Sequence, residues 1–110
     1  MPHFMLLMHE DHSRMARMSP EEMQKAVEKY MAWGRKPFMV EGRRLAGDPG
    51  KVIREGGRRV SDGPYSETKE VFGGYFTIEA RDYDEAVRLS MDHPHLEYGG
   101  TIEVRQLFQM

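Results

Sequence analysis

The chain has 110 residues, a length that predicts one domain, over residues 1–110, with one hydrophobic core. Its 16 basic and 18 acidic side chains give a net charge of −2, which argues against a nucleic-acid-binding module. The lack of cysteine excludes disulfides, zinc–thiolate sites and cysteine nucleophiles. Since no apolar stretch approaches the ~18 residues of a membrane span, we expect a cytoplasmic protein that binds neither membrane nor nucleic acid.

Residues 3–9 are predicted to form the first strand. The apolar side chains of this stretch alternate and supply both of its faces, with Phe4, Leu6 and Met8 on one and Met5 and Leu7 on the other. Two apolar faces are typical of a central strand that is covered on both sides. The mixed and mostly polar residues 10–18 that follow predict a loop.

A helix is predicted to begin just after Ser19. This serine can act as the N-cap, the proline that follows suits the first helical position, and Glu22 completes a capping box. Apolar residues then recur at helical spacing and form one stripe, made of Met23, Ala26, Val27, Tyr30, Met31 and Gly34. Because Gly34 and Pro37 interrupt this pattern, we expect the helix to end near Arg35.

The middle of the chain predicts a short strand and a small hairpin. Residues 43–46 are predicted as the second strand, and residues 38–42 before it are ambiguous. After a dense turn signal at residues 47–50, two short runs, residues 51–54 and 58–61, flank Glu55-Gly56-Gly57 in the pattern of a hairpin. Since this hairpin is polar on both faces, we expect it to project from the main sheet.

The remaining residues predict a strand, a helix and a last strand. Residues 73–80 read as the third main strand, with Gly73-Gly74 as a bulge leading into it. A capping box at residues 82–85 starts a helix whose apolar stripe is Tyr83, Ala86, Val87, Ser90 and Met91. His93-Pro94 is expected to stop this helix before the last strand. The order β-α-β, hairpin, β-α-β predicts an α+β, ferredoxin-like sheet with both helices on one face.

The charged, turn-rich loop before the third strand is the most distinctive stretch of the chain. Its sequence DGPYSETKE, followed by GGYF, resembles the signature of the YCII-related family in its DGPF-motif branch. Other segments match that branch in order and spacing: FMLLMH, SPEEM, GKV, DYDEAV and PHLEYGGTIEVR. The resemblance covers nearly the whole chain. It implies a ferredoxin-like fold that pairs as a dimeric α/β barrel, with a cleft of largely unassigned activity.

Two features depart from the pattern of that family. The branch usually has phenylalanine where this chain has Tyr65. In the wider family, the catalytic pair is a histidine near the start of the first helix and an aspartate just before the proline after the second helix. The corresponding places here hold Glu22 and His93, so that pair is absent as such.

The polar groups that remain predict a different site. His95 follows the second helix and can act as an acid or a base near neutral pH, and Asp62 opens the signature loop and could orient an imidazole. The alternatives are a surface histidine and an aspartate that only holds the turn. We predict a catalytic pair, His95 and Asp62, and ligand-binding residues Tyr65, Glu67, Lys69 and His93. For His93 the alternative is a residue at the C-terminal end of a helix, where the helix dipole favours it. For Glu67 and Lys69 the alternative is a position on a solvated loop surface.

The predicted function is the binding of a small organic molecule in a cleft beside the DGPYSETKE loop. Cofactor-independent proton transfer, either isomerisation or elimination, fits the available groups, because no redox centre or activated nucleophile is evident. The HEDH run at residues 9–12 fits no established zinc spacing, so no metal ion or cofactor is expected. A non-catalytic ligand-binding or regulatory module is the alternative, and an interaction domain for another protein would need an exposed apolar patch.

A homodimer is also predicted. Two helices can cover only one face of a four-stranded sheet. If the other face stayed in water, Met5, Leu7 and Tyr75 would form a large apolar patch. Pairing two such faces about a two-fold axis buries both copies. The alternation of side chains therefore predicts the same assembly that the family resemblance implies.

Overall fold

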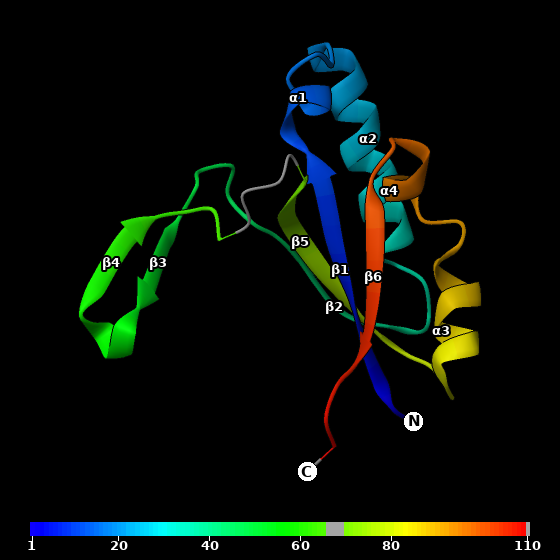
Figure 1. Ribbon diagram of the computed structural model, residues 1–110. Helices are drawn as coiled ribbons and strands as arrows, with labels where there is room; N and C mark the ends of the chain where they lie inside the picture. Colours follow the sequence, from blue (N-terminus) through cyan, green and yellow to red (C-terminus); the bar gives the residue numbers. More distant parts are fainter. Residues whose placement is uncertain (66–69, 110) are drawn as a thin grey trace.

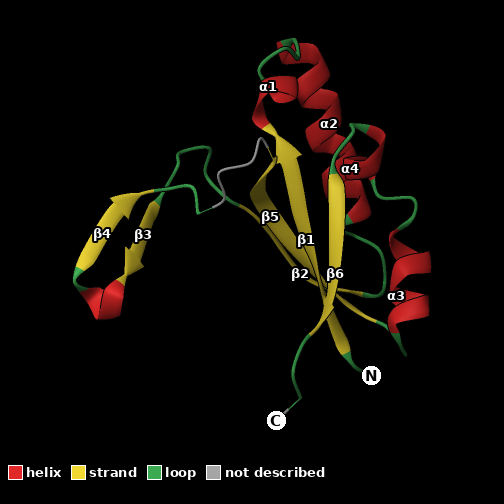
Figure 2. Cartoon of the chain, viewed as in Figure 1, coloured by secondary structure: helices red, strands yellow, loops and turns green. Residues whose placement is uncertain are grey.

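The computed structural model describes residues 1–65 and 70–109, and within them four strands form one antiparallel sheet (Figure 1). In the order β2-β5-β1-β6, these strands are β2 (Met39–Arg44), β5 (Glu70–Glu79), β1 (His3–Asp11) and β6 (Thr101–Gln106). The helices are α1 (His12–Met15), α2 (Pro20–Trp33), α3 (Tyr83–Ser90) and α4 (Pro94–Glu97). Figure 2 shows α2, α3 and α4 on one side of the sheet. None of the helices described is long and apolar enough to span a membrane.

A separate hairpin lies away from the sheet. It consists of β3 (Lys51–Arg54) and β4 (Arg59–Asp62), joined by the 3-10 turn η1 (Glu55–Gly57). Figure 1 shows this hairpin projecting to one side of the main body. The prediction of a projecting hairpin is therefore confirmed, and its two strands form a sheet of their own.

The central strand β1 pairs antiparallel with β5 along one edge and with β6 along the other. Leu6, for example, lies opposite Phe76 of β5 and Val104 of β6. The first and third main strands therefore lie in the middle of the sheet, and β2 and β6 form its edges. This α+β arrangement is consistent with the predicted ferredoxin-like fold.

The core lies between the helices and one face of the sheet. Buried residues along β1 alternate with half-buried ones, as a strand with one face in the core requires. The buried apolar cluster contains Phe4, Leu6, Met8, Trp33, Ile78, Ala80 and Ala86. Each large side chain in it contributes roughly 1.5–3 kcal/mol to the free energy of folding.

The two long helices begin as the sequence predicts. The Ser19 hydroxyl accepts a hydrogen bond from the Glu22 backbone N–H, and the Glu22 carboxylate accepts one from the Ser19 N–H. At the start of α3, the Asp82 side chain accepts from the backbone N–H of Glu85. The Glu85 carboxylate accepts from the N–H of Arg81 instead of Asp82, so only half of the capping box predicted at residues 82–85 is formed. These local bonds satisfy backbone groups that a helix leaves unpaired at its first turn. Because they involve near neighbours in the chain, they could be predicted from the sequence.

The structure corrects the predicted bounds of several elements. β1 continues past the predicted end to Asp11, because its pairing with β5 runs on to Glu70. The predicted bulge lies inside β5, where Gly73 is the extra residue between the partners of Met8 and His9. β2 begins at Met39, four residues before its predicted start. The segment after His93 contains the short helix α4 instead of a loop alone.

The apolar stripe of α2 is not simply a core face. Ala26 is buried, but Val27 and Met31 are 48% and 59% exposed, and Trp33, outside the predicted stripe, is buried instead. The Trp33 ring contacts the ring of Phe76 with their centroids 5.5 Å apart. The C-terminal end of α2 is therefore packed on the sheet, while its exposed apolar side chains line a cavity.

Candidate functional site

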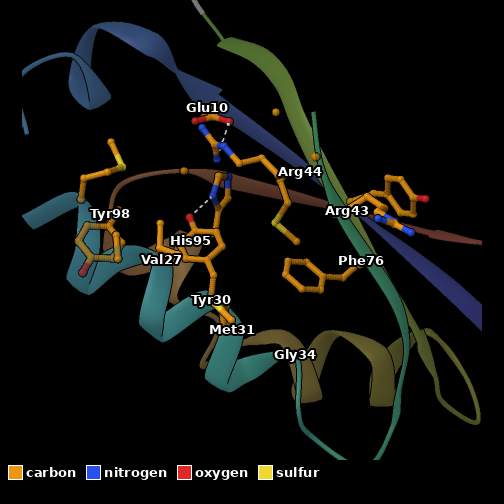
Figure 3. Close-up of a pocket in the computed structure, with 18 of the residues that line it drawn as sticks. Glu10, Val27, Tyr30, Met31, Gly34, Arg43, Arg44, Phe76, His95 and Tyr98 are labelled. Carbon is orange, nitrogen blue, oxygen red and sulfur yellow. Dashed lines mark hydrogen bonds and ion pairs between the residues drawn. The ribbon is translucent and has the colours of Figure 1, made fainter. Parts of the chain in front are cut away.

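A cavity of about 400 Å³ lies between α2 and the helix-covered face of the sheet. We call it the helix–sheet pocket, and Figure 3 shows it with most of its lining side chains. Its apolar wall is formed by Met8, Met23, Ala26, Val27, Met31, Met39 and Phe76. The polar residues that line it include Glu10, Arg14, Tyr30, Arg44 and His95. A cavity of this size, mainly apolar with a few polar groups, is typical of a small-molecule site.

Both ring nitrogens of His95 are hydrogen-bonded. Nδ1 lies 2.7 Å from the hydroxyl oxygen of Tyr30, and Nε2 lies 2.7 Å from the backbone carbonyl oxygen of His9. Because a carbonyl can only accept, Nε2 carries the proton of the neutral ring, and Nδ1 accepts from the Tyr30 hydroxyl. The ring, with only 4% of the residue exposed, is therefore held in one tautomer.

Two neighbouring backbone features hold His95 in place. The backbone N–H of His95 donates to Nδ1 of His93, the residue that caps α4. On the other side, Gly100 lies against the imidazole ring, and a Cβ atom at Gly100 would be 2.2 Å from Nε2. The ring therefore depends on a residue without a side chain at that position.

Tyr30 is the member of this hydrogen-bonded chain that lines the pocket. Figure 3 shows its hydroxyl directed at the His95 ring from α2. Burial and, secondly, the negative charge of Glu10 raise the pKa of Tyr30 well above its ordinary value of 10.0. The phenol is therefore neutral at physiological pH and can both donate and accept a proton in hydrogen bonds.

Glu10 is a pocket residue that the sequence interpretation missed. It is only 7% exposed, and its Oε1 lies 3.8 Å from Nη1 of Arg44. A Cβ atom at Gly73 would be 1.5 Å from this Oε1, so the bulge glycine makes room for the carboxylate. The alternation Phe4, Leu6, Met8 continues to Glu10, and this period of two was the signal that places it on the buried face.

His93 has a structural position next to the pocket. It is 1% exposed, and its ring packs against the rings of Trp33, Phe76 and Tyr30, with centroids 4.3, 4.9 and 5.4 Å away. Burial, and then the nearby His95, lower its pKa from 6.5 to about 4. The ring is thus neutral near pH 7 and caps α4, which differs from the charged helix C-terminal residue considered above.

We expect His93→Asn to flatten the dependence of stability on pH. The unfolded chain binds a proton at the ordinary pKa of 6.5, whereas the folded ring binds it only near pH 4, so stability falls as the pH drops between these values. The loss reaches at most about 3 kcal/mol. Asparagine can retain the cap on α4 but does not titrate.

Urea unfolding at several pH values between 4 and 7 measures this effect. Two charged groups, Asp92 and Lys36, also influence the pKa of the His93 ring. They remain in the variant, so a pH dependence as steep as that of the wild type would show that His93 is not its source.

Asp62, the predicted partner of His95, lies on β4. Its carboxylate forms an ion pair with Lys51 across the hairpin, and both residues are largely exposed. Asp62 does not line the helix–sheet pocket, whereas His95 does. Within one chain, the structure therefore does not bring these two residues together.

The predicted ligand-binding residues also lie in different places. Tyr65 is 78% exposed, and the guanidinium of Arg54 lies 5.4 Å from the centre of its ring. Glu67 and Lys69 lie outside the described residues. No group of three or more histidine and carboxylate side chains in the described ranges is placed to share a metal ion.

Another hollow, here called the loop-side groove, lies next to the described part of the signature loop. Its lining includes Pro64 and Tyr65 from the signature loop and residues 70–73 of β5. It shares Glu10, Arg44 and Gly73 with the helix–sheet pocket. The two hollows therefore meet at the Glu10–Arg44 ion pair.

Fold and pocket together define the class of the protein: a small α+β domain whose helices enclose a cavity against one face of an antiparallel sheet. The family model described as the YCII-related domain matches residues 2–110. The chain therefore belongs to the YCII-related family, and the family predicted from the sequence is confirmed. No curated protein matches the chain.

A solved structure with a similar fold is that of 5-chloro-2-hydroxyhydroquinone dehydrochlorinase from Burkholderia phenoliruptrix AC1100, in complex with 2,5-dihydroxybenzoquinone. The two chains are 15% identical, with a TM-score of 0.57, and the match covers 100% of this chain and 96% of that chain. This similarity supports the α+β fold over the whole length of the chain.

Proposed function

We propose that this protein binds a small organic molecule in the helix–sheet pocket and catalyses a cofactor-independent proton transfer there, either an isomerisation or an elimination. The observation that carries the proposal is the hydrogen-bonded chain from Tyr30 through His95 to the His9 carbonyl, with Tyr30 lining the cavity. Such a chain can store a proton inside the protein without a metal ion or cofactor.

The proton balance of the proposed step is simple. A proton leaves the substrate for the Tyr30 oxygen while the hydroxyl proton of Tyr30 moves to Nδ1 of His95, and the electron pair stays on the substrate. His95 becomes an imidazolium that keeps its Nε2–H on the His9 carbonyl. The reverse movement returns a proton to the substrate at another atom in an isomerisation, or to the solvent after a leaving group departs.

In this scheme Tyr30 contacts the substrate and His95 acts through it. The two steps at Tyr30 occur together, because burial and the charge of Glu10 disfavour a free phenolate. Tyr30 is thus the residue next to the imidazole, a position that the sequence assigned to Asp62.

The similar fold of a dehydrochlorinase solved with a ring-shaped ligand favours, by analogy, elimination and a ring-containing substrate.

A non-catalytic ligand-binding or regulatory module is the second candidate. It is favoured by the same two bonds of His95, because a histidine whose nitrogens are both engaged inside the protein can serve structure alone. In that case the pocket would bind its ligand without moving a proton.

Tyr30→Phe separates the two candidates. It keeps the ring and removes the hydroxyl, so we expect proton transfer to fall about 10²- to 10⁴-fold while the affinity for the ligand falls by no more than about tenfold. Deuterium incorporation from D₂O into enolisable cyclic ketones, followed by NMR, measures the first, and ligand titration measures the second.

Tyr83→Phe is the matched control, since that hydroxyl is on α3 and the residue lines neither the helix–sheet pocket nor the loop-side groove. Binding by the wild type without deuterium incorporation would favour the non-catalytic module. Equal incorporation by Tyr30→Phe and wild type would contradict the relay.

We further propose that the chain is a cytoplasmic member of the DGPF-motif branch and forms a homodimer, as a dimeric α/β barrel, through the sheet face opposite the helices. Met5 and Leu7 of β1 are on that face, and Tyr75 of β5 lies opposite Leu7. The paired β6 residues, Arg105 and Glu103, add charge at the rim. An apolar centre with a polar rim is typical of protein interfaces.

The net charge of −2 supports the absence of a nucleic-acid partner.

A further inference from the structure

We infer that the substrate of the helix–sheet pocket is a monoanion with an apolar body, a carboxylate or an enolate, whose negative group binds beside Arg14 and Arg44. This inference rests on the proposed ligand-binding function of the pocket and adds the chemical class of the ligand. It follows from the charges that line the cavity and from their placement.

The charged residues lining the pocket are Glu10, Asp11, Arg14, Arg43 and Arg44. Three arginines and two carboxylates leave an excess of one positive charge among the described lining residues. Arg43 points away from the cavity in Figure 3 and pairs with Glu41 at 3.9 Å. Asp11 accepts hydrogen bonds from the N–H and hydroxyl of Ser13. If Arg43 and Asp11 are both left out of the sum, the excess is still one positive charge.

The Glu10 carboxylate balances one of the two remaining arginines. Its Oε1 is 3.8 Å from Nη1 of Arg44, and Figure 3 shows Arg44 reaching over the cavity towards it from β2. The carboxylate cannot move towards β5, because Gly73 already lies against it. The Glu10–Arg44 pair is thus close to neutral, and the excess positive charge belongs to Arg14.

Arg14 lies against the backbone at the edge of the cavity. A Cβ atom at Gly99 would be 1.7 Å from Nη1 of Arg14, and the backbone of Gly99 has a φ of +83°. This glycine therefore gives room to the guanidinium as well as forming a left-handed turn. Among the described residues, Arg14 has no ion-pair partner, so its N–H donors can bind a ligand.

The rest of the lining defines the body of the ligand. The wall formed by Val27, Met31 and Phe76 offers apolar contacts, and a molecule seated against it would pass the Tyr30 hydroxyl. A guanidinium matches the planar, two-oxygen geometry of a carboxylate. A group with a larger charge, such as a phosphate, would exceed the single positive charge available. The site therefore fits a small apolar acid or enolate.

Matched probes test this inference with the full-length wild-type chain. Cyclohexanecarboxylate is compared with neutral cyclohexanecarboxamide, and 4-nitrophenolate with neutral 4-nitroanisole, by NMR titration at low salt. We expect at least one anion to bind at least about tenfold more tightly than its neutral counterpart. A preference for the carboxylate alone would identify a carboxylic acid, and a preference for the phenolate alone would identify an enolate.

Arg14→Gln should reduce binding of the preferred anion about tenfold and leave the neutral probe unchanged. Arg14→Lys, which keeps the charge, should retain most of the preference. Arg88→Gln, on the exposed face of α3, is the matched control and should change nothing. Salt should weaken binding of the anion alone.

The possible failures are distinguishable. If both members of each pair shift the signals of Val27 and Met31 with equal affinity, or if Arg14→Gln keeps the preference for the anion, the inference about charge is overturned and the pocket remains a ligand site. If no probe shifts these signals, the inference is overturned together with the proposed binding function.

Discussion

Replacing Gly100 with alanine is expected to displace the His95 ring and to remove proton-transfer activity. The added Cβ atom would lie 2.2 to 2.5 Å from three atoms of the imidazole, which is buried and bonded at both nitrogens. Because the ring cannot share this space, it must leave Tyr30 or the start of β6 must shift. We expect activity to fall at least about 100-fold and the free energy of unfolding to fall by about 1–3 kcal/mol.

Deuterium incorporation measures the activity, urea unfolding measures the stability, and the imidazole NMR signals of His95 report the position of the ring. Gly47→Ala is the control, because a Cβ atom there would meet no atom of the described residues within 4 Å, its chain neighbours aside. The free energy of unfolding of this variant should change by less than about 0.5 kcal/mol. Unchanged imidazole signals in Gly100→Ala would contradict the expected displacement.

A charged residue at Leu7 is expected to dissociate the proposed homodimer. Leu7 lies on the face opposite the helices, between Tyr75 of β5 and Glu103 of β6. In Leu7→Glu, a new carboxylate would be buried at the interface beside Glu103, which costs several kcal/mol. We expect the dissociation constant of the dimer to rise at least about 100-fold.

Sedimentation at micromolar concentration measures this change. Met91→Glu places the same charge on a residue of the helix-covered side that is 67% exposed, and we expect it to stay dimeric. A monomeric wild type, or a Leu7→Glu variant that sediments as a dimer, would show that this face is not the interface.

The fold could be predicted because its signals are local. Capping residues such as Ser19 and Asp82 act within one helical turn, and alternation along β1 defines a strand from its own side chains. The order of elements then leaves few topologies that connect them without crossing. Even so, the predicted first strand is too short, because the residues after His9 are polar and were assigned to a loop. Only the pairing with β5 shows that β1 reaches Asp11.

The site could be predicted only in part, because its contacts join distant segments. His95 was identified as a candidate from its chemistry, but Tyr30, its partner 65 positions away, reads as one more apolar member of the α2 stripe. The proposed role of Tyr30 depends on the cavity between α2 and the sheet, which Tyr30 lines. The spacing of apolar residues along a helix does not predict such a cavity. Asp62 was assigned from its place in the signature loop, whereas the projecting hairpin pairs it with Lys51.

The central position of β1 has a consequence for how the chain folds during synthesis. Both of its partner strands, residues 70–79 and 101–106, are made much later, so at about 5–20 residues per second its five apolar side chains wait several seconds for a sheet. Pairings so distant in sequence also slow folding after release. Tyr30 can meet His95 only when residues 94–100 have docked on α2. The nascent chain is therefore most prone to aggregate before that docking, and the proposed proton relay is among the last features to form.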